Sequence, residues 1–176
     1  MPVLPFFLSI AFTALMAQLT IHLPEATGGI PITGQSLAVL LVGMLLRQPW
    51  GALAVSTYVL IGLLGLPVFA DGRSGWAVLA GGSGGFLLGF IAGAAMLGWL
   101  GELGWGRHLG KALAAMAIGT AIILAFGLLR LALLYGWEKA LSYGFYPFWP
   151  GALVKIVVGA ILAWGATMAF VPVKEN

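Results

Sequence analysis

The stretch that decides the fold is 145-FYPFWPGALVKIVVGAILAWGATMAF-170, near the end of the chain. Its apolar run continues to Val171 and is long enough for a helix that crosses the hydrocarbon core of a bilayer, which takes about 20 residues. Pro150 suits the first turn of a helix, where the missing N–H costs nothing. The stretch therefore predicts a membrane-spanning helix that begins at the Pro-Gly turn and carries one ammonium group, Lys155, about one turn inside.

The composition of the whole chain supports a membrane protein. The 176 residues are 61% hydrophobic and 7% charged, whereas a soluble domain carries about 25% charged residues. The mean hydropathy is +1.08. We therefore expect an all-α integral membrane protein, a single membrane domain over 1–176. The apolar segments predict six transmembrane helices, at about 4–22, 34–46, 50–68, 85–100, 112–135 and 151–171.

The residue types that the chain lacks exclude several function classes. It has no cysteine, so it has no disulfide, thiol nucleophile or thiolate metal site. Its 8 basic and 5 acidic residues are too sparse for a nucleic-acid surface. The Gly110-Lys111-Ala112 sequence lacks the Ser/Thr of a phosphate-binding loop, so another subunit would have to supply any ATPase. His22 and His108 are far from other ligand-type residues, and no metal site is expected.

The distribution of charge predicts an orientation. Six spans place both termini on one side of the membrane, and that side holds four of the six loop and terminal basic residues, namely Arg47, Arg107, Lys111 and Lys174; Arg73 and Lys139 are on the other. The positive-inside rule therefore predicts cytoplasmic termini. The Gly-rich loops before the second span and after the third, together with the YPFWPG turn, then lie outside, which is the arrangement of a site open to the exterior.

A serine motif offers an enzymatic alternative. The sequence GGSGG at 81–85 matches the nucleophile elbow G-x-S-x-G, and its G-x-S-G resembles the serine motif of rhomboid intramembrane proteases, which also have six spans. That chemistry needs a His base within hydrogen-bond reach of Ser83. His108 is expected in an inner loop and His22 at the outer end of the first span. A flexible turn that lets the fourth span begin close to its neighbours is the favoured interpretation.

Two charged residues inside predicted spans are candidates for ligand contact. Ionisable side chains within the membrane are costly and often mark functional sites, and the N-terminus of a helix favours anions. We therefore expect Lys155 to contact a ligand. Arg130, about five residues before the outer end of the fifth span, either extends to the surface or faces the ligand.

Two further patterns concern surfaces. Ser9, Thr13 and Ala17 follow one another at intervals of four in the first span, and small residues at that spacing let another helix approach closely. This face is a candidate for docking against a partner helix.

Aromatic residues such as Tyr146 crowd the predicted outer ends of the spans. This is expected both for an interfacial belt and for a pocket whose aromatic rings stack on a flat ligand.

Three segments carry a resemblance to a known family. They are PITGQSLAVLLVGMLL at 31–46, GALAVSTYVLIGLLGLPVFADGRSGWAVLAGGSGGFLLGFIAGA at 51–94, and PFWPGALVKIVVGA at 147–160. In this order they resemble the biotin-transporter S components of the energy-coupling factor (ECF) type, the BioY family. The likeness extends from about Pro31 to Ala160.

The resemblance implies a six-helix subunit that captures biotin under its outer loops, is not an enzyme and holds no cofactor. It implies a transmembrane ECF coupling subunit and two ATPase subunits as partners, in a prokaryotic inner membrane. The face formed by Ser9, Thr13 and Ala17 would then be a docking surface for the coupling subunit. The alternatives are the same architecture with another vitamin-like ligand, a structural subunit without a ligand, and the rhomboid-like protease.

The sequence departs from the family pattern in the site. The family often has PGDxxK, and here the lysine is Lys155 but the Asp position holds Ala152; Leu87 stands where some members have an arginine. The two N–H groups of a biotin ureido ring need acceptors, because an unpaired group costs about 1–3 kcal/mol. We expect Lys155 at the ureido oxygen. The other candidate ligand contacts are Gln35, Thr33, Ser83 and Asp71 as acceptors, Arg73 or Arg130 at the valerate carboxylate, and Phe86, Tyr146 and Ala152 as neighbours.

Overall fold

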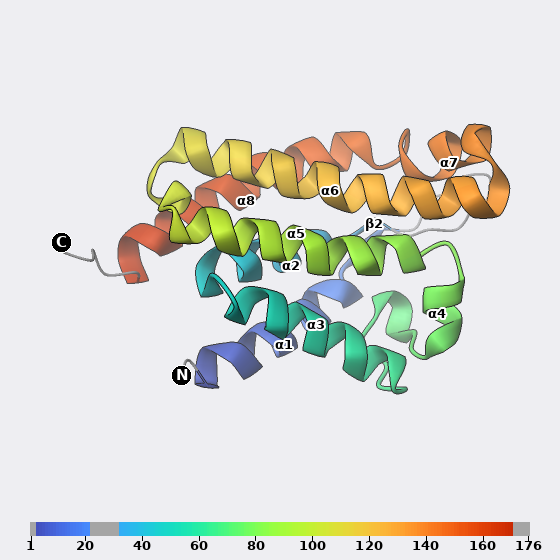
Figure 1. Ribbon diagram of the computed structural model, residues 1–176, viewed down its shortest axis with the longest axis horizontal. Helices are drawn as coiled ribbons and strands as arrows, with labels where there is room; N and C mark the ends of the chain where they lie inside the picture. The colour runs from blue at the N-terminus through green and yellow to red at the C-terminus, as the bar shows by residue number, and fades with distance from the viewer. Residues whose placement is uncertain (1–2, 22–31, 171–176) are drawn as a thin grey trace.

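The computed structural model describes residues 3–21 and 32–170 (Figure 1). Within these residues, six apolar helices form a bundle: α1 Val3–Gln18, α2 Gln35–Leu46, α3 Trp50–Leu63, α5 Gly84–Glu102, α6 Leu109–Tyr135 and α8 Trp149–Phe170. Short elements connect them: β1 Thr20–Ile21, β2 Ile32–Thr33, η2 Ala70–Gly72, α4 Trp76–Ala80, η3 Trp105–Arg107 and α7 Trp137–Gly144. The prediction of an all-α bundle is confirmed. His22, and the predicted span end at Val171, lie outside the described residues.

Each predicted span coincides with one apolar helix, but the helices differ in length. Three of those described, α5, α6 and α8, are long and apolar enough to cross a membrane. The helices α1, α2 and α3 are shorter. The third span was predicted to reach Val68, whereas α3 ends at Leu63. Gly65 follows with φ 112°, a conformation that suits glycine, and the chain turns there.

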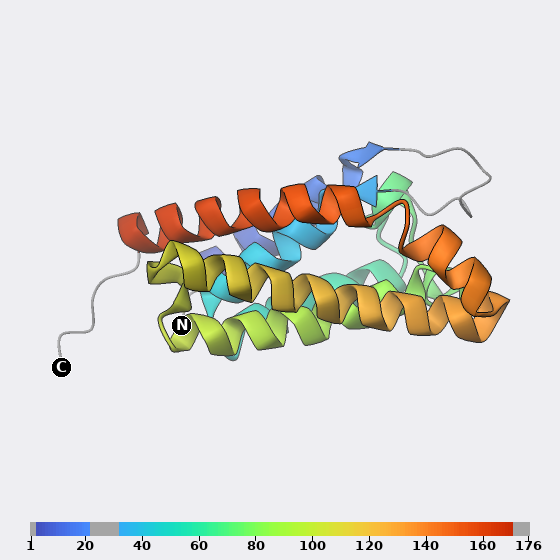
Figure 2. The same cartoon turned by 90° about the horizontal axis from the view of Figure 1, so that it is seen from above.

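Close backbone contacts hold α5 against its neighbouring helices. It packs against α2, α3 and α6, and α8 in turn packs against α6 and α2 (Figures 1 and 2). A Cβ atom on Gly85 would lie 2.3 Å from the backbone oxygen of Phe126 in α6, and one on Gly43 would lie 2.7 Å from that of Ala94. Small residues thus let these helices approach closely, as is usual in membranes.

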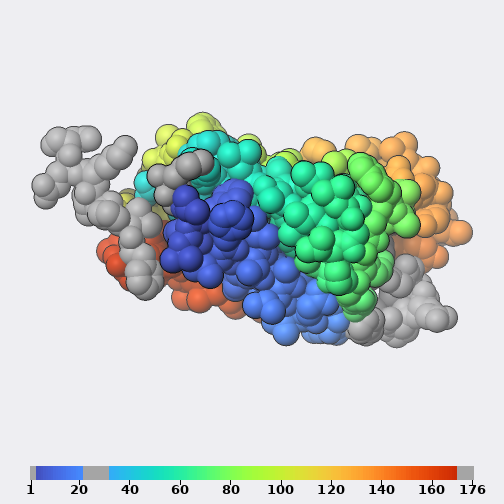
Figure 3. All heavy atoms as spheres, turned by 90° about the horizontal axis from the view of Figure 1, so that it is seen from below, coloured from blue at the N-terminus to red at the C-terminus, as the bar shows by residue number. Residues whose placement is uncertain are grey.

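The small-residue face of α1 packs inside the chain, which corrects one prediction. Ser9, Thr13 and Ala17 are all buried, with 7%, 1% and 0% of their surface exposed. Helix α1 packs against α2 and α3, and its other face is on the outside of the bundle in Figure 3. These three residues are therefore not available to a partner subunit, because other helices of the same chain already pack against this face.

The segments that connect the helices lie at two opposite ends of the bundle. The start of α1 and the end of α8 lie at one end, whereas α4, α7 and β2 lie toward the other (Figure 1). β1 pairs antiparallel with β2, with Thr20 opposite Thr33. The two ends of the described chain are thus on the same side, and the irregular segments that precede α2, α5 and α8 gather on the opposite side.

Candidate functional site

A largely apolar pocket lies beneath these irregular segments. Its volume is about 820 Å³, including the part that is open at its mouth. Small-molecule sites likewise combine apolar walls with a few polar groups. The apolar lining is Leu37, Leu40, Phe69, Ala70, Val78, Phe86, Leu87, Phe90, Ile123, Leu124, Phe148 and Ala152. The polar lining is Thr33, Gln35, Ser36, Arg73, Ser83, Thr120 and Lys155.

Lys155 reaches across the pocket from α8 to the start of α2. Its Nζ donates to the backbone oxygen of Thr33 at 2.6 Å and to Ser36 Oγ at 3.0 Å. Both acceptors are neutral, and the described residues that line the pocket include no carboxylate. The ammonium therefore gives the pocket a positive charge, which favours a ligand with an anionic or strongly polar oxygen.

Arg73 and Ser83 lie together at the mouth. The Arg73 side chain is exposed, and its Nε donates to the backbone oxygen of Ala70 at 3.3 Å. Its Nη2 lies 3.5 Å from Ser83 Oγ, at the outer limit of a hydrogen bond. The guanidinium is thus a second cation with access to both solvent and the pocket.

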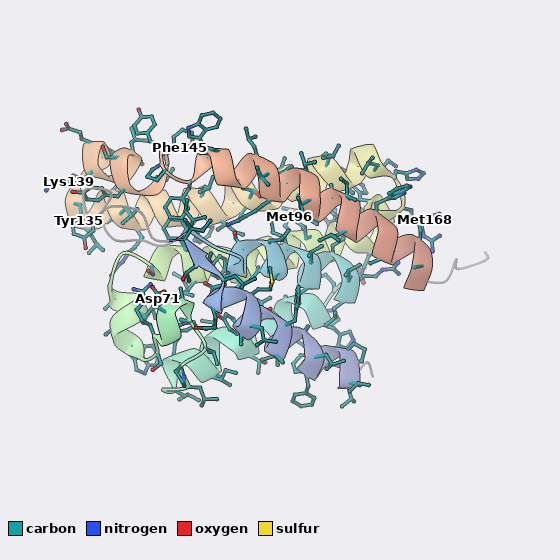
Figure 4. The ribbon with its side chains drawn as sticks, turned by 180° about the vertical axis from the view of Figure 1, so that it is seen from behind. Asp71, Met96, Tyr135, Lys139, Phe145 and Met168 are labelled. Carbon is teal, nitrogen blue, oxygen red and sulfur yellow. The ribbon has the colours of Figure 1, made fainter. Side chains whose placement is uncertain are left out.

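Three predicted site residues do not line the pocket. The Arg130 guanidinium donates to the backbone oxygens of Ala80 and Gly81 and so joins α6 to the turn between α4 and α5. Tyr146 has 60% of its surface exposed. Asp71 is an exposed residue of η2, at the same end of the bundle as Lys139 and Tyr135 (Figure 4).

The other seven predicted ligand contacts do line the pocket: Thr33, Gln35, Arg73, Ser83, Phe86, Ala152 and Lys155. Sequence reasoning missed Ser36, Thr120 and Phe148. Thr120 offered a signal, as a hydroxyl in the apolar part of α6 between Lys111 and Arg130. Phe148 stacks on Phe86 with ring centroids 5.7 Å apart, and this pairing of residues far apart in sequence had no local signal.

The geometry does not pair Ser83 with His108. Ser83 immediately precedes α5, and His108 immediately precedes α6. The 19 residues of α5 separate them by about 28 Å at the usual helical rise. His108 therefore cannot serve as a base for Ser83. The other histidine, His22, lies outside the described residues.

Comparison with solved structures finds the same fold in another membrane protein. The fold matches a crystal structure described as the S-component for biotin from an ECF-type ABC transporter, with a TM-score of 0.80. The match covers 94% of this chain and 92% of that chain at 22% sequence identity. The architecture is thus that of an ECF S component, a membrane bundle with its pocket beneath the loops at one end.

The chain belongs to the BioY family, whose sequence profile matches residues 3–171. It is 42% identical to the biotin transporter BioY of Thermotoga maritima over 137 residues, which is 77% of this chain and 80% of that protein. It is 38% identical to the biotin transporter BioY of Rhizobium etli over 166 residues, which is 88% of each. The predicted resemblance to this family is confirmed.

Proposed function

We propose that this chain is the substrate-capture subunit of a vitamin uptake transporter, and that it binds biotin from the outer face for transport across the membrane. The observation that carries this proposal is the Lys155 ammonium, held by Thr33 and Ser36 inside an apolar pocket. Biotin offers an apolar ring system, a polar ureido group and a carboxylate. An apolar pocket with one inner and one outer cation is complementary to that distribution.

We assign the inner cation to the ureido oxygen and the outer cation to the carboxylate. Lys155 is part-buried against β2 and α2, whereas Arg73 is at the mouth. Arg73 is favoured over Arg130 for the carboxylate because Arg130 is already bonded to two backbone oxygens of the α4–α5 turn. Gln35, Thr33 and Ser83 line the pocket, and we assign them as acceptors for the ring N–H groups. Asp71 lies outside the pocket lining, so we do not assign it as an acceptor.

We infer that the chain works with a transmembrane coupling subunit and two ATPases of the ECF type. The structurally similar protein is described as the S-component of such a transporter, and this sequence has no phosphate-binding loop of its own. We place it in a prokaryotic inner membrane with cytoplasmic termini, with no cofactor and no catalytic step. A different vitamin-like ligand is the second candidate, because Ala152 replaces an expected carboxylate in the pocket lining.

Binding of labelled biotin to the purified protein in lipid nanodiscs tests this function. We expect saturable binding with a sub-micromolar dissociation constant, which unlabelled biotin displaces. Saturable binding of another labelled vitamin, without saturable binding of biotin, would support the second candidate. Covalent labelling of Ser83 by a fluorophosphonate probe would contradict the proposal and favour an enzyme.

Restoring a carboxylate at position 152 should strengthen biotin binding. Ala152 lines the pocket three residues before Lys155 in α8, so an Asp there faces the same side of the helix. In the Ala152→Asp variant we expect the dissociation constant to fall about tenfold, since hydrogen bonds to charged groups contribute about 1.5–3 kcal/mol. Ala152→Asn, which adds an acceptor without charge, should give a smaller gain. Weaker binding in both variants, measured by titration with labelled biotin, would contradict the assigned geometry.

A further inference from the structure

Two hydrogen bonds, one buried and one part-buried, run from the pocket wall into the core. Gln35, the first residue of α2, lines the pocket with 5% of its surface exposed. Its Nε2 lies 2.7 Å from the Oη of Tyr58 in α3, which is fully buried. The same Tyr58 Oη lies 2.8 Å from the backbone oxygen of Val68, in the segment that follows α3. The tyrosine hydroxyl therefore makes both hydrogen bonds.

The chemistry of these groups fixes the direction of both bonds. A tyrosine hydroxyl has one proton to donate, and a backbone carbonyl can only accept. Tyr58 must therefore donate its proton to Val68, and its oxygen can then only accept from Gln35. The NH₂ group of Gln35 has to face Tyr58, because the reverse orientation would bring two acceptors together. The amide oxygen Oε1 is consequently the Gln35 atom left for the pocket.

We propose that Tyr58 is a positioning residue that fixes Gln35 as a hydrogen-bond acceptor, and that Gln35 Oε1 accepts a ring N–H of the ligand. This inference rests on the proposed function, because a ureido ring supplies such donors. It explains how a pocket whose described lining has no carboxylate can satisfy an N–H group. Without Tyr58, the Gln35 amide could present either its oxygen or its NH₂ group.

The surroundings hold Tyr58 in place before any ligand arrives. Its ring packs edge-on against Phe69, with centroids 5.8 Å apart, and only 2% of the Phe69 surface is exposed. The Phe69 ring in turn packs over Gly62, where a Cβ would lie 2.3 Å from its Cζ atom. An acceptor that is fixed in advance costs less ordering free energy on binding.

A double-mutant cycle tests the inference with biotin and the full-length protein in nanodiscs. We expect Tyr58→Phe to raise the dissociation constant about tenfold, because the orientation of the Gln35 amide is no longer fixed. A Gln35→Glu side chain presents an acceptor oxygen to the pocket in either orientation, because both carboxylate oxygens accept. In this variant the Tyr58 proton goes to the other carboxylate oxygen instead of to Val68. Adding Tyr58→Phe to Gln35→Glu should therefore cost less than threefold. Tyr143→Phe, which removes a hydroxyl from α7 outside the pocket lining, should leave the affinity unchanged.

The outcomes separate the two proposals. Equal losses from Tyr58→Phe in both backgrounds would show a merely structural role and overturn the inference, as would no loss from the single variant. Absence of saturable biotin binding to the unmodified protein would instead remove the proposed function, and the inference with it. If Tyr58→Phe does not fold, Gln35→Glu and Gln35→Met decide: we expect the former to stay within threefold and the latter to lose about tenfold. Equal affinities of these two variants would overturn the inference.

Discussion

Replacing Lys155 by Met is expected to weaken biotin binding by about 10- to 100-fold while the helical bundle stays folded. The Met side chain keeps most of the length of the lysine but removes the ammonium that donates to Thr33 and Ser36. A hydrogen bond between a charged group and the ligand is worth about 1.5–3 kcal/mol, which corresponds to that range of dissociation constants. Titration of nanodisc-embedded variants with labelled biotin measures the change.

Lys139 provides the matched control for this experiment. It lies on α7 with an exposed side chain, at the same end of the molecule but outside the pocket lining (Figure 4). Lys139→Met therefore removes the same charge from the same end without touching the site, and should leave the affinity unchanged. Equal affinity of Lys155→Met and the unmodified protein would contradict the assignment of Lys155 to the ligand.

The second large effect concerns stability, and we expect it from Gly85→Ala. The added Cβ would lie 2.3 Å from the Phe126 backbone oxygen and 2.4 Å from Arg130 Cβ. A backbone oxygen cannot rotate out of the way, so α5 and α6 must separate. Overpacking of this kind typically costs about 1–3 kcal/mol. Unfolding of the purified protein by increasing denaturing detergent, followed by circular dichroism, measures the loss.

Gly110→Ala is the control for the stability experiment. Gly110 is near the start of α6, and a Cβ there would meet nothing within 4 Å. Alanine is the better helix former by up to about 1 kcal/mol, so this variant should be as stable as the unmodified protein or slightly more stable. If Gly85→Ala unfolded at the same detergent fraction as Gly110→Ala, the α5–α6 contact would not be the close approach described above.

Hydropathy predicted the large helices because each carries its own signal. A run of apolar residues is visible without knowledge of its neighbours, and all six predicted spans correspond to helices. The early end of α3 was missed because Leu64 and Leu66 continue the apolar pattern beyond the turn at Gly65. The role of the Ser9 face was misassigned because small residues favour close packing against any helix, and the sequence does not specify which one.

The site was predictable in part for a similar reason. Lys155 is conspicuous because a charge within an apolar helix is costly, and Thr33, Gln35 and Ser83 lie in unusual polar segments. The hydrogen bonds between Gln35, Tyr58 and Val68 could not be predicted, since a tyrosine in an apolar helix resembles any other core aromatic. Arg130 was ambiguous because its partners are backbone oxygens of a distant turn, which no side-chain pattern reveals.

The hydrogen bond from Lys155 to Thr33 has a consequence for biosynthesis, because its two partners are 122 positions apart. A ribosome delivers Thr33 long before Lys155, so the pocket cannot be completed until α8 enters the membrane. A chain interrupted before Trp149 would insert most of its helices and still lack Ala152, Lys155 and the α8 wall of the pocket. Ligand binding therefore requires that α8 has been synthesised and has packed beside α2.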